Sequence, residues 1–63
     1  MQFGDLVFFS LQKNRITHVG IYVGFGEFVH ASEKYGVIRS RLHDKYWADS
    51  FVGARRVLVL RPR

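Results

Sequence analysis

Hydrophobic residues along this chain occur in short runs interrupted by glycine, asparagine or aspartate, and many of them are β-branched or aromatic. Runs of this kind are typical of β-strands joined by tight connections. The pattern predicts five strands, at residues 5–10, 16–23, 27–32, 37–42 and 52–60. Because the connections between them are short, we expect neighbouring strands to pair antiparallel.

One segment departs from the strand pattern. In "HDKYWADSF", Asp44 suits the N-cap of a helical turn, and Trp47 and Phe51 lie four residues apart on one face of such a turn. The expected fold class is therefore mainly β, a small antiparallel sheet or half-barrel of about five strands with one short helical turn near 44–50.

Both faces of the expected sheet are apolar. In "DLVFF", Leu6 and Phe8 alternate with Val7 and Phe9. An antiparallel sheet usually exposes one face to water, and this chain has no long amphipathic helix to cover a second apolar face. The sheet should therefore curl on itself, pair with another copy, or form part of a larger domain.

Size and composition narrow the function classes. The chain has 63 residues and no cysteine, so disulfides and thiolate zinc sites are excluded, and a core of this size gives only about 3–5 kcal/mol. The formal net charge of +5 favours an anionic partner, but the basic residues are scattered, and a nucleic-acid interface is not expected. We find neither an apolar run of about 18 residues, as a membrane span requires, nor the pattern of a signal peptide.

The candidate chemistry lies in "THVGIYVGFGEFVHAS", which predicts a hairpin with a histidine on each strand. A two-residue loop would place His18 and His30 on opposite sides of the sheet. A three-residue loop at 24–26 would place them on the same side, and Gly26 suits the left-handed conformation that this loop requires at its last position. His30 would then lie opposite Gly20 and diagonal to His18, at about 7–8 Å.

From the residues alone, three interpretations of this pair remain open. One histidine could act as a general base while the other fixes its orientation and tautomer. Each could instead be a partly buried strand residue with no chemical role. A metal site with two histidines is the third interpretation, although no carboxylate on the same face offers a third ligand.

Four motifs in order, "GDLVFF", "HVGIYVGFGEFVHAS", "YW" and "FVGARRVL", resemble the second half of the NlpC-type peptidoglycan endopeptidases, which are papain-like cysteine peptidases. The resemblance runs from Gly4 to about Leu58. It implies that His18 is the catalytic base and that His30 orients it. His43 matches no catalytic position and is expected at the surface.

The chain departs from this family at the nucleophile, which the family carries as a cysteine in a "DCSG"-like motif upstream of the first strand. No cysteine is present, and we do not expect any of the serines to replace it: Ser10, Ser32, Ser40 and Ser50. The expected organisation is one partial domain over 1–63, the sheet half of a papain-like peptidase domain without its cysteine-bearing helical half. Alone, it is expected to be inactive.

The resemblance also suggests partners and location. It implies peptidoglycan stem peptides as substrate, no cofactor or metal, and a bacterial or phage protein of the cell envelope or secreted. The missing half should cover the sheet face that carries His18, Tyr22, Phe28 and His30, so we expect either that half or a homo-oligomer or strand-exchanged dimer as partner. The alternatives are a small basic β-module that binds wall polymer or another anion, and a non-catalytic oligomerising scaffold.

Overall fold

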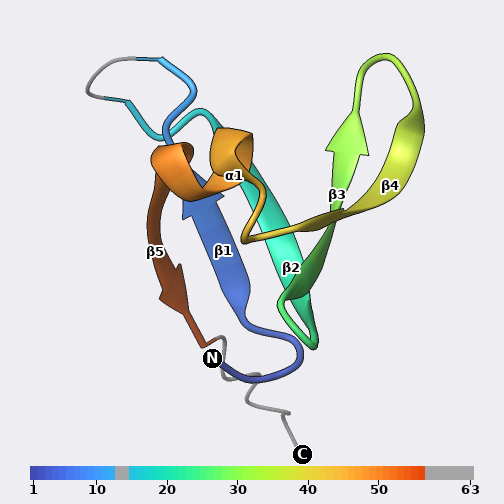
Figure 1. The fold of residues 1–63 in the computed structure, drawn as a ribbon, viewed down its shortest axis with the longest axis vertical. Coiled ribbons are helices and arrows are strands. Elements are labelled where there is room, and N and C mark those ends of the chain that lie inside the picture. The colour runs from blue at the N-terminus through green and yellow to red at the C-terminus, as the bar shows by residue number, and fades with distance from the viewer. Residues whose placement is uncertain (13–14, 57–63) are drawn as a thin grey trace, which may run out of the picture.

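The computed structural model describes residues 1–12 and 15–56. They form one open antiparallel sheet with the strand order β4-β3-β2-β1-β5 and one short helix (Figure 1). The elements are β1 (Leu6–Phe9), β2 (His18–Gly24), β3 (Glu27–Ser32), β4 (Gly36–Arg41), α1 (Lys45–Ser50) and β5 (Phe51–Arg55). The mainly β class, the five strands and the helical turn are therefore confirmed. Of the predicted last strand, residues 57–60 lie outside the described residues.

A small aromatic core lies between the sheet and α1. Val7, Phe9 and Phe28 are fully buried, and Trp47 of α1 packs on them. The Trp47 ring lies 4.9 Å from that of Phe9 and 5.2 Å from that of Phe28, both edge-on. Asp44 occupies the predicted N-cap position but its side chain forms no capping hydrogen bond. Packing by Trp47, rather than capping, therefore holds this short helix on the sheet.

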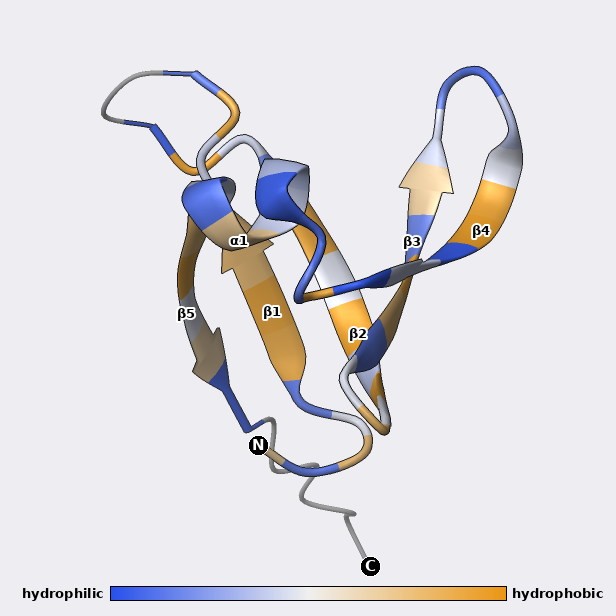
Figure 2. Cartoon of the chain, in the orientation of Figure 1, coloured by the Kyte–Doolittle hydropathy of each residue, from blue (hydrophilic) through white to orange (hydrophobic). Residues whose placement is uncertain are grey.

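The face covered by α1 is the one that carries the histidines, which corrects our expectation of an aromatic surface awaiting a missing half. In the register of β1 and β2, Phe9 pairs with His18 and Val7 with Gly20, so these residues share the α1 face. The opposite face is the apolar one left open: Val19, Ile21 and Val37 are 48%, 47% and 75% exposed. Figure 2 shows the apolar residues that run along β1 and β2. The chain's own helix covers the face that we expected to be bare.

The tip of the β2–β3 hairpin differs from the predicted three-residue loop. Gly24 pairs with Glu27, which leaves a two-residue turn, and its residues Phe25 and Gly26 both have a left-handed backbone, with φ of 55° and 77°. A bulge between Tyr22 and Gly24 then shifts the register, so that Tyr22 pairs with Phe28. The predicted register along the strands is thus correct although the predicted loop is wrong, because the bulge adds the residue that the turn omits.

Asp5 has a structural role: it closes the turn that leads into β1. Its carboxylate is buried and accepts hydrogen bonds from the Gln2 amide at 2.9 Å and from Arg56 Nε at 3.3 Å. The bond from Gln2 and, less strongly, the Arg56 guanidinium lower the pKa of Asp5 below its ordinary value of 3.8, against the opposing effect of desolvation. Asp5 is therefore an anchor between the N-terminal turn and the end of β5.

Candidate functional site

The structure brings the two predicted site histidines into direct contact. His18 stands at the start of β2 and His30 in the middle of β3. Nε2 of His18 lies 2.8 Å from Nδ1 of His30, and the two rings meet edge-on with centroids 4.9 Å apart. A distance of 2.8 Å is that of a good hydrogen bond, so one of these two nitrogens carries the shared proton.

Gly20 makes room for this contact. It is buried in β2 beside β3, and a Cβ at this position would lie 2.7 Å from Phe28 Cδ2 and 3.4 Å from the Cβ of His30. Any side chain at position 20 would displace the ring of Phe28, on which His30 packs with centroids 4.6 Å apart. The glycine that we expected opposite His30 therefore has a physical reason.

Trp47 forms a wall over both imidazoles. Its ring stacks on His18 at 5.4 Å with an interplanar angle of 28°, and meets His30 edge-on at 4.8 Å. His30 is only 5% exposed. Burial, and secondarily the charge of His18, lower the pKa of His30 below its ordinary value of 6.5. The lowered pKa favours the neutral imidazole of His30 at neutral pH, and a neutral imidazole has one ring nitrogen that can accept a hydrogen bond.

A third residue, for which the sequence predicted no contact with the histidines, completes the arrangement. Ser40 of β4 places its Oγ 2.8 Å from Nε2 of His30. In the β3–β4 register, Ser40 pairs with Phe28 and Ile38 with His30, so Ser40 lies diagonally across from His30 on the same face. The alternation of β3 and β4 is a signal in the sequence that places Ser40 on this face.

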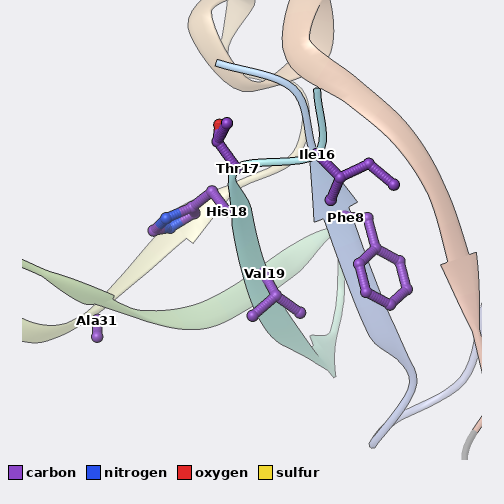
Figure 3. Close-up of a pocket in the computed structure, with 6 residues that line it drawn as sticks. All are labelled: Phe8, Ile16, Thr17, His18, Val19 and Ala31. Atoms are coloured by element: carbon purple, nitrogen blue, oxygen red, sulfur yellow. The ribbon is translucent and has the colours of Figure 1, made fainter. Parts of the chain in front are cut away.

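His18 is reachable from two sides. A hollow of about 380 Å³ is lined by His18, four residues near the start of β2 and the end of β1, and Ala31 (Figure 3). In Figure 3 the imidazole of His18 and the side chain of Ile16 leave the chain in opposite directions. A larger groove, of about 780 Å³, runs past His18, His30 and Ser40 beneath Tyr46 and Trp47. The half-buried His18 therefore stands between an apolar hollow and a more polar groove.

Chemically, an imidazole in this arrangement can act as a base, and within the described residues no hydroxyl or thiol is bonded to it as a nucleophile would be. Nδ1 of His18 makes no hydrogen bond in this part of the chain, so it is the nitrogen left for a reacting group. The other serine hydroxyls bond to backbone groups: Ser10 Oγ donates to Gln12 O, Ser50 Oγ donates to Tyr46 O, and Ser32 Oγ accepts from the amides of Lys34 and Tyr35. None of these hydroxyls is bonded to His18.

The third histidine of the chain lies away from this pair. His43 is exposed and lies over the hairpin turn, where its ring would be 3.3 Å from a Cβ at Gly26. Across residues 1–12 and 15–56 no group of three or more His, Cys, Asp or Glu side chains could hold a metal ion. In the same residues no helix has the length and apolar character to cross a membrane.

Known proteins resemble this chain over most of its length. The model of the NlpC/P60 family matches residues 1–56. A "Probable endopeptidase NlpC homolog" of Haemophilus influenzae is 49% identical over 55 residues, which are 87% of this chain and 28% of the relative. The "Murein DD-endopeptidase MepS/Murein LD-carboxypeptidase" of Escherichia coli is 49% identical over 87% of this chain and 29% of its own length. The chain thus spans less than a third of these relatives.

Solved structures show the same sheet. An NlpC/P60 family protein from Bacillus cereus superposes with a TM-score of 0.80 at 32% identity, over 89% of this chain and 19% of that one. A protein of the same family from Staphylococcus aureus, described as similar to a lipoprotein, gives 0.77 at 40% identity, over 95% and 21%. The five-stranded unit described above is therefore a recurring part of larger proteins.

Proposed function

Because the chain belongs to the NlpC/P60 family, we propose that it carries the general base of a peptidoglycan endopeptidase, with His18 as the base and His30 as the residue that orients it. One observation carries this proposal: Nε2 of His18 lies 2.8 Å from Nδ1 of the buried His30. That bond fixes the ring of His18 and, when Nε2 of His18 is the donor, leaves Nδ1 as the nitrogen that can accept a proton.

The reaction that suits this base is thiol-dependent hydrolysis of an amide bond in a peptidoglycan stem peptide. Nδ1 of His18 accepts the thiol proton, and the thiolate attacks the amide carbonyl to form a tetrahedral intermediate. The proton passes from His18 to the departing amine, which leaves an acyl-enzyme. Water then gives a proton to His18 while its oxygen attacks the acyl carbon. The C–S bond breaks, the acid is released, and His18 returns the proton to the sulfur to regenerate the thiol. Whenever His18 is an imidazolium, Nδ1 of His30 accepts a hydrogen bond from its Nε2–H.

The thiol must come from outside this chain, which contains no cysteine. We place it on a cysteine-bearing helical half, so that residues 1–63 are the sheet half of one papain-like domain. The open apolar face favours a contact with that half. Val19 and Ala31 belong to this face, and both border the hollow that contains His18. Such a domain would act in the cell envelope or after secretion, where peptidoglycan lies.

The test is to complete the domain. The segment that precedes the matched region in the Escherichia coli relative, 49% identical to this chain, would be fused upstream of Met1. We expect the fusion to release soluble muropeptides from purified peptidoglycan and the 63-residue chain to release none. Because this chain has no thiol and iodoacetamide reacts with thiolates far faster than with imidazoles, a brief treatment should modify a cysteine of the added segment and abolish the release.

Two results would contradict the proposal. Turnover that survives complete alkylation would exclude a thiol nucleophile. A folded fusion that is retained on peptidoglycan at low salt, released at high salt and never cleaves it would identify a basic binding module instead.

A further inference from the structure

Both ring nitrogens of His30 are engaged. Nδ1 faces His18 at 2.8 Å, and Nε2 faces the hydroxyl of Ser40 at 2.8 Å. The three side chains come from three adjacent strands, β2, β3 and β4. They form a line of two hydrogen bonds from His18 to Ser40. Because a neutral imidazole has only one N–H, the direction of one hydrogen bond determines the direction of the other.

This line has two possible arrangements when both histidines are neutral. In the first, His18 donates its Nε2–H to Nδ1 of His30, and His30 donates its own Nε2–H to Ser40 Oγ. In the second, the Ser40 hydroxyl donates to Nε2 of His30, His30 donates from Nδ1, and His18 carries its proton on Nδ1. Only the first arrangement leaves Nδ1 of His18 unprotonated and therefore basic.

We propose that Ser40 is a positioning residue whose hydroxyl oxygen accepts the Nε2–H of His30 and so holds His18 in the tautomer with a free Nδ1. The catalytic meaning of this inference rests on the proposed function. The tautomer itself is a property of the folded chain and is measurable without turnover.

The surroundings make Ser40 the acceptor that His30 needs. His30 is 5% exposed and enclosed by Phe28 and Trp47, so water is largely excluded from its ring. A buried N–H without an acceptor would be costly, and in the described residues no buried side-chain nitrogen or oxygen lacks a partner. Ser40 itself borders the groove of about 780 Å³, where its O–H can donate a hydrogen bond to water. The hydroxyl is thus free to act as the acceptor.

The tautomers can be read directly in the 63-residue chain. With ¹⁵N-labelled histidine at pH 8, two-bond ¹H–¹⁵N correlation spectra distinguish protonated from unprotonated ring nitrogens. We expect His18 and His30 both to be protonated mainly on Nε2. Ser40→Ala should lower the ratio of Nε2–H to Nδ1–H in His18 about fivefold, the equivalent of one hydrogen bond of about 1 kcal/mol. Ser40→Thr, which retains a hydroxyl, should restore the ratio.

The control is Ser50→Ala. Ser50 is the last residue of α1, and its hydroxyl donates a hydrogen bond to the Tyr46 carbonyl and not to either histidine. It should leave both tautomers unchanged. A wild-type spectrum in which His18 carries its proton on Nδ1 would overturn the inference without any variant. An unchanged ratio in folded Ser40→Ala would overturn it as well.

The same variants separate this inference from the proposed function. In the completed domain, Ser40→Ala should lower kcat with little change in KM, because it alters the base and not substrate binding. A tautomer shift in the chain together with a completed domain that never cleaves peptidoglycan would uphold the role of Ser40 and overturn the hydrolase. An active domain in which the tautomer of His18 is the same with and without the Ser40 hydroxyl would uphold the hydrolase and overturn the role of Ser40.

Discussion

At the scale of single residues, the site depends on a few close contacts between β2, β3 and α1. Gly20 leaves the space, His18 and His30 share a proton, and Trp47 covers them. These contacts are short enough that one added methyl group or one added proton should change the free energy of unfolding.

Gly20→Ala should destabilise the fold by about 1–3 kcal/mol, because the new Cβ would lie 2.7 Å from the Phe28 ring. Gly53→Ala is the matched control: Gly53 also lies in a strand, but a Cβ there would meet nothing within 4 Å. Urea unfolding followed by tryptophan fluorescence would report on Trp47 directly. Equal stabilities for the two variants would contradict the close approach of β2 and β3.

The stability of the fold should fall as the pH drops below 6.5. The pKa of His30 is lowered in the folded state, so the unfolded chain takes up a proton first, and the free energy of unfolding decreases through the window below 6.5. Asp5 stays ionised in this window because its pKa lies below 3.8. We expect a lower urea midpoint at pH 5 than at pH 7.5, a smaller difference in His30→Gln, and the full difference in His43→Gln. A wild-type midpoint that does not change would contradict the burial of His30.

At the scale of elements, the hairpin that carries the site has an unusual turn. Both turn residues are left-handed, a conformation that favours Asn-Gly, yet Phe25 stands at the first position and is fully exposed. Tyr22 steadies the tip, because its hydroxyl accepts a hydrogen bond from the Gly26 amide at 2.9 Å. The turn is therefore held in place by the strands, at a local cost in backbone energy.

Replacing Phe25 by Asn should stabilise the chain by about 1 kcal/mol, because Asn tolerates the left-handed conformation and no buried contact is lost. Phe25→Val should destabilise it, since a β-branched residue is poorly suited to positive φ. Thermal unfolding of the three proteins would rank them. A midpoint for Phe25→Asn below that of the wild type would mean that the Phe25 side chain has a stabilising contact in the folded chain.

The hairpin also shows how far the sequence could predict the site. Alternation with a three-residue loop predicted His18 and His30 on one face, and the structure reaches that register by a two-residue turn and a bulge. The two-residue turn was not predictable, because nothing in its chemistry marks Phe25 as left-handed. The side of the sheet on which Ser40 lies follows from the alternation of β3 and β4. The stacking of Trp47 on His18 was not predictable, because it depends on how α1 returns to the sheet, which residue spacing along the hairpin does not determine.

At the scale of the whole molecule, the main feature is the open apolar face opposite α1. Val19, Ile21 and Val37 are about half exposed or more, and Leu6, Val29 and Ala31 line the same surface around a hollow of about 310 Å³. Soluble proteins rarely leave such a face uncovered. In a completed domain we expect the cysteine-bearing half to cover it, and in the chain alone a second copy.

The isolated chain should therefore associate as its concentration rises. Light scattering should show a dimer or larger species, and Ile21→Lys or Val37→Lys should shift it towards monomer, because association would bury an unpaired ammonium group. Tyr35→Lys is the control, since Tyr35 is exposed in the β3–β4 turn and away from this face. A monomer at every concentration would contradict self-association, and oligomers that persist in both face variants would indicate pairing of strand edges instead.

The central claim, that His18 is the base of a thiol-dependent peptidoglycan hydrolase, is tested most directly by the rate of muropeptide release from the completed domain carrying His18→Gln. We predict a loss of about 10²-fold or more, because the thiol then has no proton acceptor. The same domain carrying His43→Gln should retain wild-type activity, since His43 lies at the hairpin turn and contacts neither site histidine. Equal rates in the two folded variants would contradict the claim.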